Sequence, residues 1–320
     1  MDTSPRGFVR TVVGDLPATN ALGVCDAHEH VVMHGGWLAE HFPEHVLADL
    51  DQTLVDLRGF RAAGGGWIVD SMPTGAGRDA ALLAQVAARS GVPIVCPTGV
   101  HQARYYPPKH PLLSLDRDRL VELFVGEIAT GIDDGAGAPE FRAGVIKVAS
   151  SGEWLTSQEK ERFVAAALAQ QQTGCPILTH TAGGRDAYEQ VAVLLGNGAA
   201  PSQVVLSHCD KNADASYHRE LLEAGVCLEY DQHFRQLSRE ECCVAVDLMV
   251  ELVDDFPHQL LVGMDMARQS YWRGYGGRPG LAWLLTDLLP MLRRAGMSDR
   301  QIVGISVENA VRAYAFRPPR

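Results

Sequence analysis

Short apolar segments rich in β-branched residues alternate along the chain with longer amphipathic segments. The apolar segments have the length of buried strands, and eight of them occur, at residues 23–31, 66–72, 92–100, 143–149, 175–180, 203–208, 225–230 and 259–264. Apolar residues at the three- and four-residue spacing of helices occupy residues 79–90, 157–173, 186–196, 215–224 and 239–256. This alternation predicts parallel strands with crossover helices, and eight units predict an α/β fold of the (β/α)8 TIM-barrel class.

Local signals support several of the predicted helix boundaries. Thr156 is followed three residues later by Glu159, and Ser238 by Glu241, which is the spacing of a capping box. Glycines suited to the left-handed position at the end of a helix follow three helical segments, at Gly91, Gly174 and Gly225. Long loops are expected at residues 101–118, which are proline-rich, and at residues 273–280, which are glycine-rich.

Composition narrows the class of protein and of partner. No linker or repeat divides the chain, so residues 1–320 are expected to form a single barrel domain with residues 1–22 as a lead-in segment. The net charge of −11 argues against a nucleic-acid partner, which needs a clustered basic surface. The sequence has neither a membrane-length apolar stretch nor the apolar core of a signal peptide, so we expect a cytoplasmic protein with no membrane partner. The seven cysteines show no CxxC spacing and predict reduced, buried thiols.

Polar residues that can bind metals follow several of the predicted strands. His28 and His30 belong to an HxH pair on the first strand, where alternate side chains share one face. His180, His208 and Asp265 end the fifth, sixth and eighth strands. The carboxyl ends of barrel strands form the rim at which active sites lie. Each histidine alone could be a buried histidine with satisfied hydrogen bonds, but the repetition at one rim indicates a metal site.

Lys147 lies within the predicted fourth strand, in Val-Ile-Lys-Val-Ala. A buried cation without a partner is costly, so Lys147 either pairs with a carboxylate or has another chemical role. An ammonium group has no lone pair for a metal, and a lysine ligand must first be converted to an anion.

The order and strand positions of these residues resemble the phosphotriesterase family of the amidohydrolase superfamily. The segment from Val303 to Ala310 is similar to the C-terminal signature of that family, which usually has proline where Ala310 stands. The resemblance implies two divalent metal ions, usually Zn²⁺, bridged by a hydroxide and by a lysine that CO₂ has carboxylated. It implies that one metal has the ligands His28, His30 and Asp265, that the more exposed metal has His180 and His208, that Lys147 is the modified, shared ligand, and that Asp265 is the catalytic proton acceptor.

Loop residues indicate the substrate class. Arg268 and Tyr271 follow Asp265 at the spacing found in the branch of the family that opens phosphorylated sugar lactones, where these positions hold the phosphate. The basic residue that assists them after the seventh strand would be Arg235, with Arg239 as the second choice. Tyr105 and Tyr106 either border the cavity or fill a turn, and Arg268 could instead pair with a loop carboxylate while Tyr271 packs under Trp272.

Other polar residues near the rim have less specific expectations. Asp210 could orient a histidine ligand or cap the next helix, and capping is the expected role of Asp214. His34, His41 and His45 are expected in a loop over the rim, and His233 in the cavity.

The sequence therefore predicts a metal-dependent lactonase that acts on a small-molecule lactone or ester and could form a homodimer. A phosphotriesterase or an N-acyl amide hydrolase with the same metal centre is the alternative enzyme. A barrel that only binds its ligand is disfavoured, because all six expected ligand positions carry residues that can bind metal.

Overall fold

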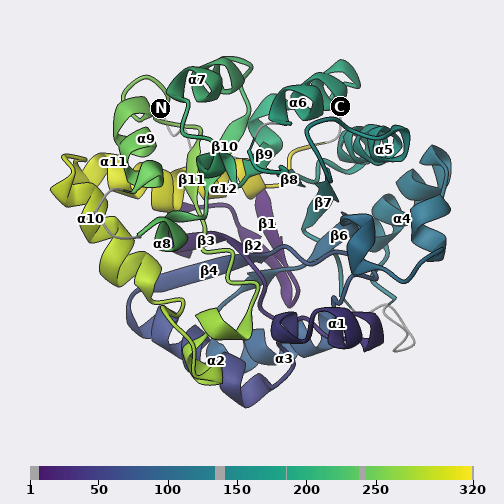
Figure 1. The fold of residues 1–320 in the computed structure, drawn as a ribbon, viewed down its shortest axis with the longest axis horizontal. Helices are drawn as coiled ribbons and strands as arrows, with labels where there is room; N and C mark the ends of the chain where they lie inside the picture. Colours follow the sequence, from purple (N-terminus) through teal and green to yellow (C-terminus); the bar gives the residue numbers. More distant parts are fainter. Residues whose placement is uncertain (1–6, 134–140, 185, 238–242, 319–320) are drawn as a thin grey trace.

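The computed structural model describes residues 7–133, 141–184, 186–237 and 243–318. Its centre is a ring of parallel strands with helices outside (Figure 1). One sheet contains β3 (Val24–Glu29), β4 (Gly65–Asp70) and β5 (Ile94–Val95). The other contains β6 (Pro97–Val100), β7 (Val145–Ala149), β8 (Ile177–His180), β9 (Val204–Ser207), β10 (Cys227–Tyr230) and β11 (Leu260–Val262).

The two sheets join at both edges and complete the barrel. β5 and β6 are two halves of one predicted strand, because β5 pairs with β4 and β6 pairs with β7 on either side of Cys96. At the other edge, the backbone N–H groups of Met264 and Asp265 both donate to His28 O, at 3.1 and 2.8 Å, just past the end of β11. The predicted (β/α)8 barrel is confirmed.

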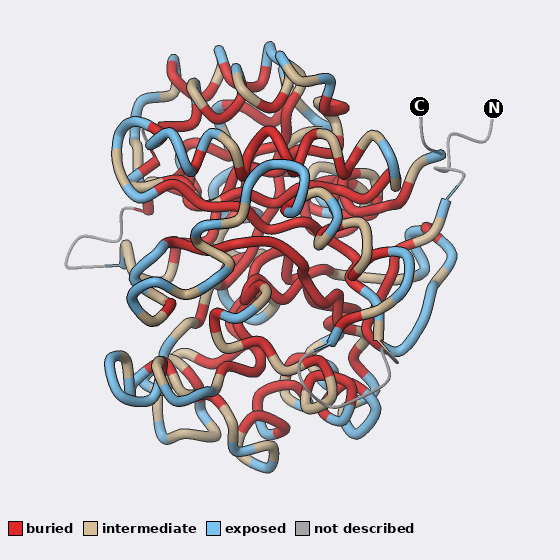
Figure 2. Tube along the Cα trace, turned by 90° about the vertical axis from the view of Figure 1, so that its right-hand side faces the viewer, coloured by how far each residue is buried: buried red, intermediate tan, exposed pale blue. Residues whose placement is uncertain are grey.

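Helices cover the outer surface of the barrel, and Figure 2 shows the buried segments running through its centre. Several bounds agree closely with the predictions: α3 (Ala80–Ser90), α5 (Ser157–Thr173), α6 (Ala187–Gly196) and α7 (Ala215–Glu223). The rest of the outer layer comprises α2 (Leu50–Ala62), α4 (Arg117–Ala129), α9 (Val244–Leu252), α10 (Leu289–Arg294), α11 (Asp299–Val303) and α12 (Asn309–Tyr314). None of the helices in the described part of the chain is long and apolar enough to cross a bilayer.

The predicted helix ends have the expected chemistry where the structure describes them. Thr156 and Glu159 form a capping box, and Gly91 and Gly174 adopt left-handed conformations with φ of 68° and 70°. Within the helix predicted at 239–256, α9 spans only Val244–Leu252. Ser238, Arg239 and Glu241 lie outside the described residues. The loop expected at 101–118 includes two short 3₁₀ turns, and α4 already begins at Arg117 because Asp116 caps it.

The hairpin of the lead-in segment covers the end of the barrel at which the strands begin. β1 (Phe8–Thr11) and β2 (Gly14–Pro17) form an antiparallel hairpin. Val12 N–H donates to Ile94 O at 2.7 Å at the start of β5, and Phe316 N–H donates to Phe8 O at 2.8 Å. The N-terminal face is thereby covered, and the rim at the carboxyl ends of the strands stays accessible.

Gly99 fixes the separation of the strands that carry the third and fourth barrel positions. It pairs with Lys147 across β6 and β7, its φ is +122°, and a Cβ at this position would meet Lys147 O at 1.8 Å. We expect Gly99→Ala to lower the free energy of unfolding by about 3 kcal/mol, through backbone strain and displacement of β7.

Urea denaturation tests this expectation. The control is Gly59→Ala in α2, where a Cβ meets nothing within 4 Å and where alanine should stabilise the helix by roughly 0.5–1 kcal/mol. Equal stability of Gly99→Ala and the wild type would show that β6 and β7 can separate without cost.

Candidate metal centre

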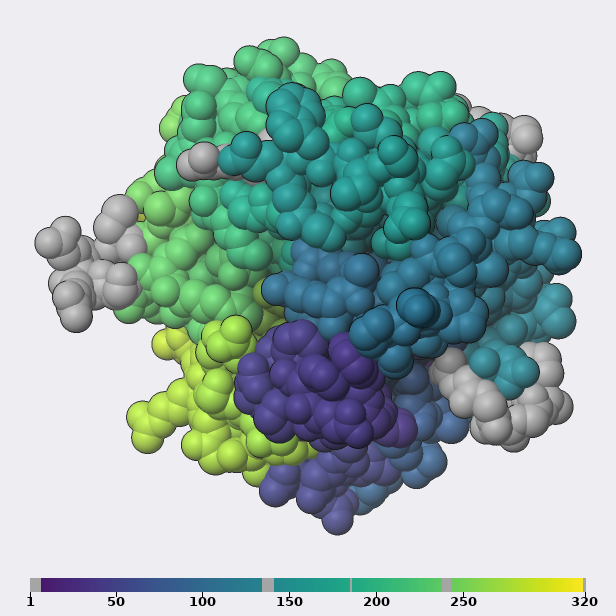
Figure 3. Space-filling model, turned by 45° about the vertical axis from the view of Figure 1, so that its right-hand side comes forward, coloured from purple at the N-terminus to yellow at the C-terminus, as the bar shows by residue number. Residues whose placement is uncertain are grey.

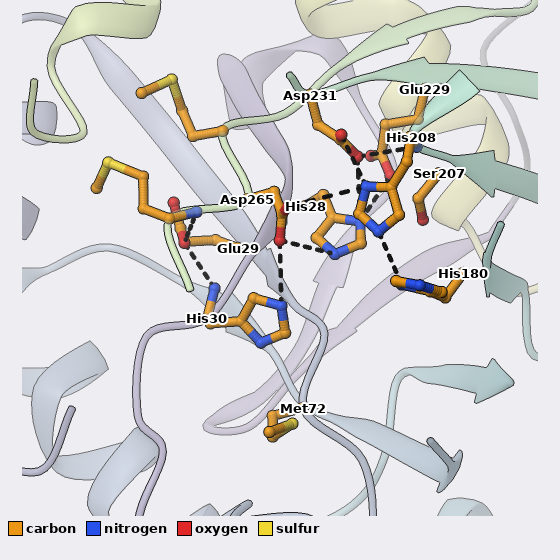
Figure 4. Close-up of polar contacts among 12 residues, drawn as sticks. His28, Glu29, His30, Met72, His180, Ser207, His208, Glu229, Asp231 and Asp265 are labelled. Carbon is orange, nitrogen blue, oxygen red and sulfur yellow. Dashed lines mark hydrogen bonds and ion pairs between the residues drawn. The ribbon is translucent and has the colours of Figure 1, made fainter. Parts of the chain in front are cut away.

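The barrel brings the predicted strand-end residues together at one rim, as Figure 4 shows. His28 lies in β3, His180 ends β8, His208 follows β9 directly, and Asp265 is the third residue after β11. His208 and Asp265 have positive φ angles of 61° and 49°. This conformation is uncommon for residues other than glycine, and it occurs here where the chain leaves the strand and the side chain points to the barrel axis.

Asp265 lies between the two histidines of the HxH pair. Its Oδ1 is 3.8 Å from His28 Nε2 and 3.3 Å from His30 Nε2. These three residues offer ligand atoms that all lie within 4.8 Å of one another. Imidazole nitrogen and carboxylate oxygen are suitable ligands for Zn²⁺, so this group could hold one metal ion.

His180 and His208 form a second group beside the first. His208 Nε2 lies 2.9 Å from His180 Nδ1, and the rings of His28 and His208 are 4.8 Å apart between centroids. The structure therefore brings together the four histidines and the aspartate that the sequence predicted as one cluster.

Two buried carboxylates of β10 and its end orient the imidazoles. Glu229 Oε2 lies 2.9 Å from His28 Nδ1, and Asp231 Oδ1 lies 2.8 Å from His208 Nδ1. A carboxylate at Nδ1 places the imidazole proton there, which leaves a lone pair on Nε2 for a metal. Neither residue was predicted from the sequence, although the alternation Glu-Tyr-Asp at the end of a predicted strand was a usable signal.

Asp210 does not have either of the roles expected for it. It accepts the backbone N–H groups of Gln232 at 2.8 Å and Asp231 at 3.3 Å, so it holds the backbone that carries Asp231. Asp214 does cap α7, because it accepts the N–H of Ser216.

Lys147 is completely buried in β7, and its ammonium group has only weak partners. Nζ lies 3.3 Å from Thr179 O and 3.4 Å from Ser207 Oγ, and within the described residues Lys147 forms no ion pair. The alternative of a close carboxylate pair is therefore not observed. Burial lowers the pKa of Lys147 to about 8, against the opposing effect of Glu229, so a substantial share of the amine is neutral near that pH.

The electrostatics of the cluster favour ligation. Burial lowers the pKa values of His28, His180 and His208, so these imidazoles stay neutral near pH 7. Burial alone would raise the pKa of Asp265, but Arg235 and the nearby imidazoles hold it well below its ordinary value. Neutral imidazoles and an ionised carboxylate are the forms that bind a divalent cation.

A cavity of ≈ 280 Å³ lies above this cluster. In a chain of net charge −11, its wall carries four cationic side chains and the single carboxylate of Asp265; the cations are Arg104, Lys211, Arg235 and Arg268. Arg104 and Lys211 were not predicted, since only the fold brings their loops to the cavity. The charge of the wall fits an anionic ligand.

The predicted substrate residues all line this cavity, but with different partners. Arg268 has no side-chain hydrogen bond or ion pair within the described residues, whereas Arg235 Nη1 binds Asp265 Oδ2 at 3.1 Å. The Arg235 guanidinium lies 4.9 Å from the centre of the Tyr271 ring, which contacts Phe234 rather than lying beneath Trp272. Tyr105 borders the cavity, whereas Tyr106 is buried and donates to Thr74 O.

The loop after β3 covers part of the rim, as expected from its histidines. Figure 3 shows this N-terminal segment in purple on the surface, between the yellow-green C-terminal loop and the blue segment after β6. His45 lines the cavity, His34 Nε2 lies 2.8 Å from Asp79 Oδ2, and His41 stacks on Trp37. His233 is not in the cavity wall: it is buried, stacks on Trp283 and donates from Nε2 to Gly263 O at 2.7 Å.

Comparisons with known proteins agree with this geometry. The model of the phosphotriesterase family matches residues 7–314. The chain is 30% identical to a phospho-furanose lactonase of Mycoplasmopsis synoviae over 98% of this chain and 93% of that protein. It is 26% identical to an N-acetyltaurine hydrolase of Danio rerio, over 98% and 99% of the two chains. A crystal structure of a lactonase from Listeria monocytogenes superposes with a TM-score of 0.88 at 26% identity, covering 97% of this chain and 99% of that one.

The burial of His233 predicts a pH dependence of stability. Burial lowers its pKa from 6.5 to about 4, so between these values the unfolded chain binds a proton that the folded chain does not. Stability is therefore lost as the pH falls through this window, with a slope of up to about 1.4 kcal/mol per pH unit from this residue. His233→Gln, which keeps a donor for Gly263 O, should flatten the slope in urea denaturation of the metal-free protein between pH 7 and pH 4.5.

His258→Gln is the control, because His258 is exposed, and it should keep the wild-type slope. An unchanged slope in His233→Gln would mean that other groups cause the acid sensitivity.

Proposed function

Since the chain belongs to the phosphotriesterase family, we propose that this hydrolase is a metal-dependent lactonase that opens phosphorylated sugar lactones. The observation that carries the proposal is the combination of an imidazole–carboxylate cluster at the cavity floor with four cationic side chains in its wall. Relatives named phospho-furanose lactonases, at 30 and 31% identity, support the same substrate class. We further propose that residues 1–320 act as one catalytic domain.

The residues fit two divalent ions, for which Zn²⁺ is our proposed identity. His28, His30 and Asp265 would hold one ion, His180 and His208 the other, and Lys147, carboxylated by CO₂, would be shared. The fit rests on the carboxylates at His28 Nδ1 and His208 Nδ1, which leave the Nε2 lone pairs unprotonated. When bound, such ions lower the pKa of a water molecule and polarise the carbonyl that it attacks.

Asp265 is the proposed proton acceptor in this reaction. Its carboxylate lies at the junction of the cluster and the cavity, 3.3 Å from His30 Nε2 and 3.1 Å from Arg235 Nη1. It can take the proton of the attacking water and return it to the ring oxygen as the lactone opens, which is general base and then general acid catalysis.

Cationic and phenolic groups on one side of the cavity would hold the phosphate. Arg268 is unpaired within the described residues, and Tyr271 and Arg235, which are in contact with each other, line the same cavity. A guanidinium binds phosphate with two parallel hydrogen bonds. Tyr105, which also lines the cavity, would contact the sugar ring.

The role of Arg268 is tested with a five-membered sugar lactone, with and without a phosphate ester. Arg268→Gln should raise KM for the phosphorylated lactone by roughly tenfold or more, since hydrogen bonds to charged groups contribute about 1.5–3 kcal/mol, and should leave kcat/KM for the unphosphorylated lactone nearly unchanged. Arg300→Gln, at an exposed arginine on α11, is the control.

Hydrolysis of unphosphorylated lactones alone would refute the roles of Arg268 and Tyr271. Faster turnover of a phosphotriester or of an N-acyl amide such as N-acetyltaurine would replace the proposed function with one of those activities.

The role of Lys147 is tested by removing the metal with a chelator and restoring Zn²⁺ at a fixed concentration of dissolved CO₂. Carboxylation needs the neutral amine, and the pKa of Lys147 is about 8, so reactivation should be faster at pH 8.5 than at pH 6.5. The restored protein should bind about two equivalents of Zn²⁺. Lys147→Met should lose the response to CO₂.

Lys211→Met, at an exposed lysine of the cavity wall, should keep that response. Full reactivation of the wild type in CO₂-free buffer, or two equivalents of Zn²⁺ in Lys147→Met, would count against carboxylation.

A further inference from the structure

His101 is a fifth imidazole in the cavity wall that the proposed mechanism does not use. It follows β6, its residue is only 4% exposed, and its ring centroid lies 5.3 Å from that of His180. It is not part of the groups of metal-binding side chains found among the described residues. Burial lowers the pKa of His101 well below its ordinary value, so the imidazole beside the cluster is neutral near pH 7.

Hydrogen bonds hold the backbone at His101 rigidly. Its N–H donates to Tyr106 Oη at 2.8 Å, and Tyr106 Oη donates to Thr74 O at 3.0 Å. The adjacent Gln102 donates from Nε2 to Ser150 O at 2.6 Å, which links the end of β6 to the end of β7. The ring itself packs edge-on against Tyr105 at 4.6 Å. The imidazole therefore has little freedom to reorient.

The backbone also decides which ring nitrogen carries the proton. Gln102 N–H donates to His101 Nδ1 at 2.7 Å, so Nδ1 is an acceptor. A neutral imidazole has one protonated nitrogen and one lone pair, and the proton must be on Nε2. His28 and His208 are the opposite case, because Glu229 and Asp231 draw the proton to Nδ1.

This tautomer gives His101 a different chemistry from the neighbouring histidines. Its lone pair is engaged by Gln102, so Nε2 can donate a hydrogen bond but cannot ligate a metal. His101 Nε2 has no hydrogen-bond partner within the described part of the chain, and the ring faces the cavity. An unpartnered donor on a buried, fixed side chain is suited to a group in which negative charge develops.

We propose that His101 is a further catalytic residue, whose neutral Nε2–H donates a hydrogen bond to the carbonyl oxygen of the lactone that is cleaved. This inference rests on the proposed function, since it takes the substrate to be a lactone. As water adds to the carbonyl carbon, negative charge grows on the carbonyl oxygen and the hydrogen bond from His101 strengthens. The proton stays on Nε2 throughout. When the C–O bond of the ring breaks, the carbonyl double bond re-forms and the negative charge leaves the carbonyl oxygen.

The tautomer is tested directly by NMR of the protein labelled with ¹⁵N-histidine, without any substrate. Long-range ¹H–¹⁵N correlation distinguishes a protonated Nε2 from a protonated Nδ1, and His101→Phe identifies the resonances of His101. We expect protonated Nε2 and unprotonated Nδ1 at pH 7. A proton on Nδ1, or a charged imidazolium, would overturn the inference whatever the substrate is.

The catalytic role is tested with the zinc-loaded holoenzyme and its preferred lactone. His101→Phe, which keeps a ring of similar size, should lower kcat by roughly 10²-fold, as does removal of one oxyanion donor in other enzymes, at unchanged zinc content. His180→Ala, at a proposed ligand, should lose zinc. His101→Gln, which retains an N–H donor, should recover part of kcat.

A thionolactone locates the contact, because sulfur accepts hydrogen bonds more weakly than oxygen does. The ratio of wild-type to His101→Phe activity should be smaller for the thionolactone than for the lactone. Equal ratios, unchanged kcat, or loss of zinc in His101→Phe would overturn the role. Failure of the wild type on every lactone would refute the proposed function instead, and the NMR result would still stand.

Discussion

The position of one proton on each buried imidazole is the constraint on which the site depends. Each neutral ring has a single N–H proton and a single nitrogen lone pair. The group that hydrogen-bonds to Nδ1 therefore decides whether Nε2 can bind a cation or donate a hydrogen bond. Glu229 and Asp231 fix this choice for His28 and His208, at 2.9 and 2.8 Å. The backbone of Gln102 fixes the opposite choice for His101. These three similar side chains at one rim can in this way have distinct tasks without any change of residue type.

Charged side chains are also unevenly distributed around the histidine cluster. The chain as a whole is strongly acidic, and several buried carboxylates, among them Asp26, Glu229 and Asp231, lie beneath the histidine cluster. Burial alone would raise the pKa of Asp231, but His208 holds it below its ordinary value, so the Asp231 carboxylate would offset part of the positive charge that divalent cations would bring into the barrel. Above the cluster the balance reverses, since arginine and lysine side chains surround the cavity. An anionic molecule entering the cavity from solvent is therefore attracted to the place where the reactive groups lie.

Much of the architecture could be predicted from the sequence because the signals were local. Buried strands of a parallel sheet are apolar throughout, so the eight barrel strands could be identified. His28, His30, His180, His208 and Asp265 could be assigned to one rim from their places at strand ends, and Lys147 from its place within the fourth strand. The helices α2 and α4 were missed, and α4 begins directly after a proline-rich loop. Arg104 and Lys211 lie on separate loops that meet only in the folded protein, so their spacing in the sequence could not predict that both line the cavity. The metal ligation, the homodimer and the cytoplasmic location stay predictions.

The seam at which the barrel closes has a consequence for how the protein comes into being. The first and the last barrel strands meet where Met264 and Asp265 donate to the carbonyl of His28, so the strands made first and last during synthesis of the barrel are direct neighbours. A growing chain that has not yet released residue 265 from the ribosome can assemble most of its core but has neither a complete ring nor an aspartate between the two histidines. Closure of the ring therefore also completes the group of His28, His30 and Asp265.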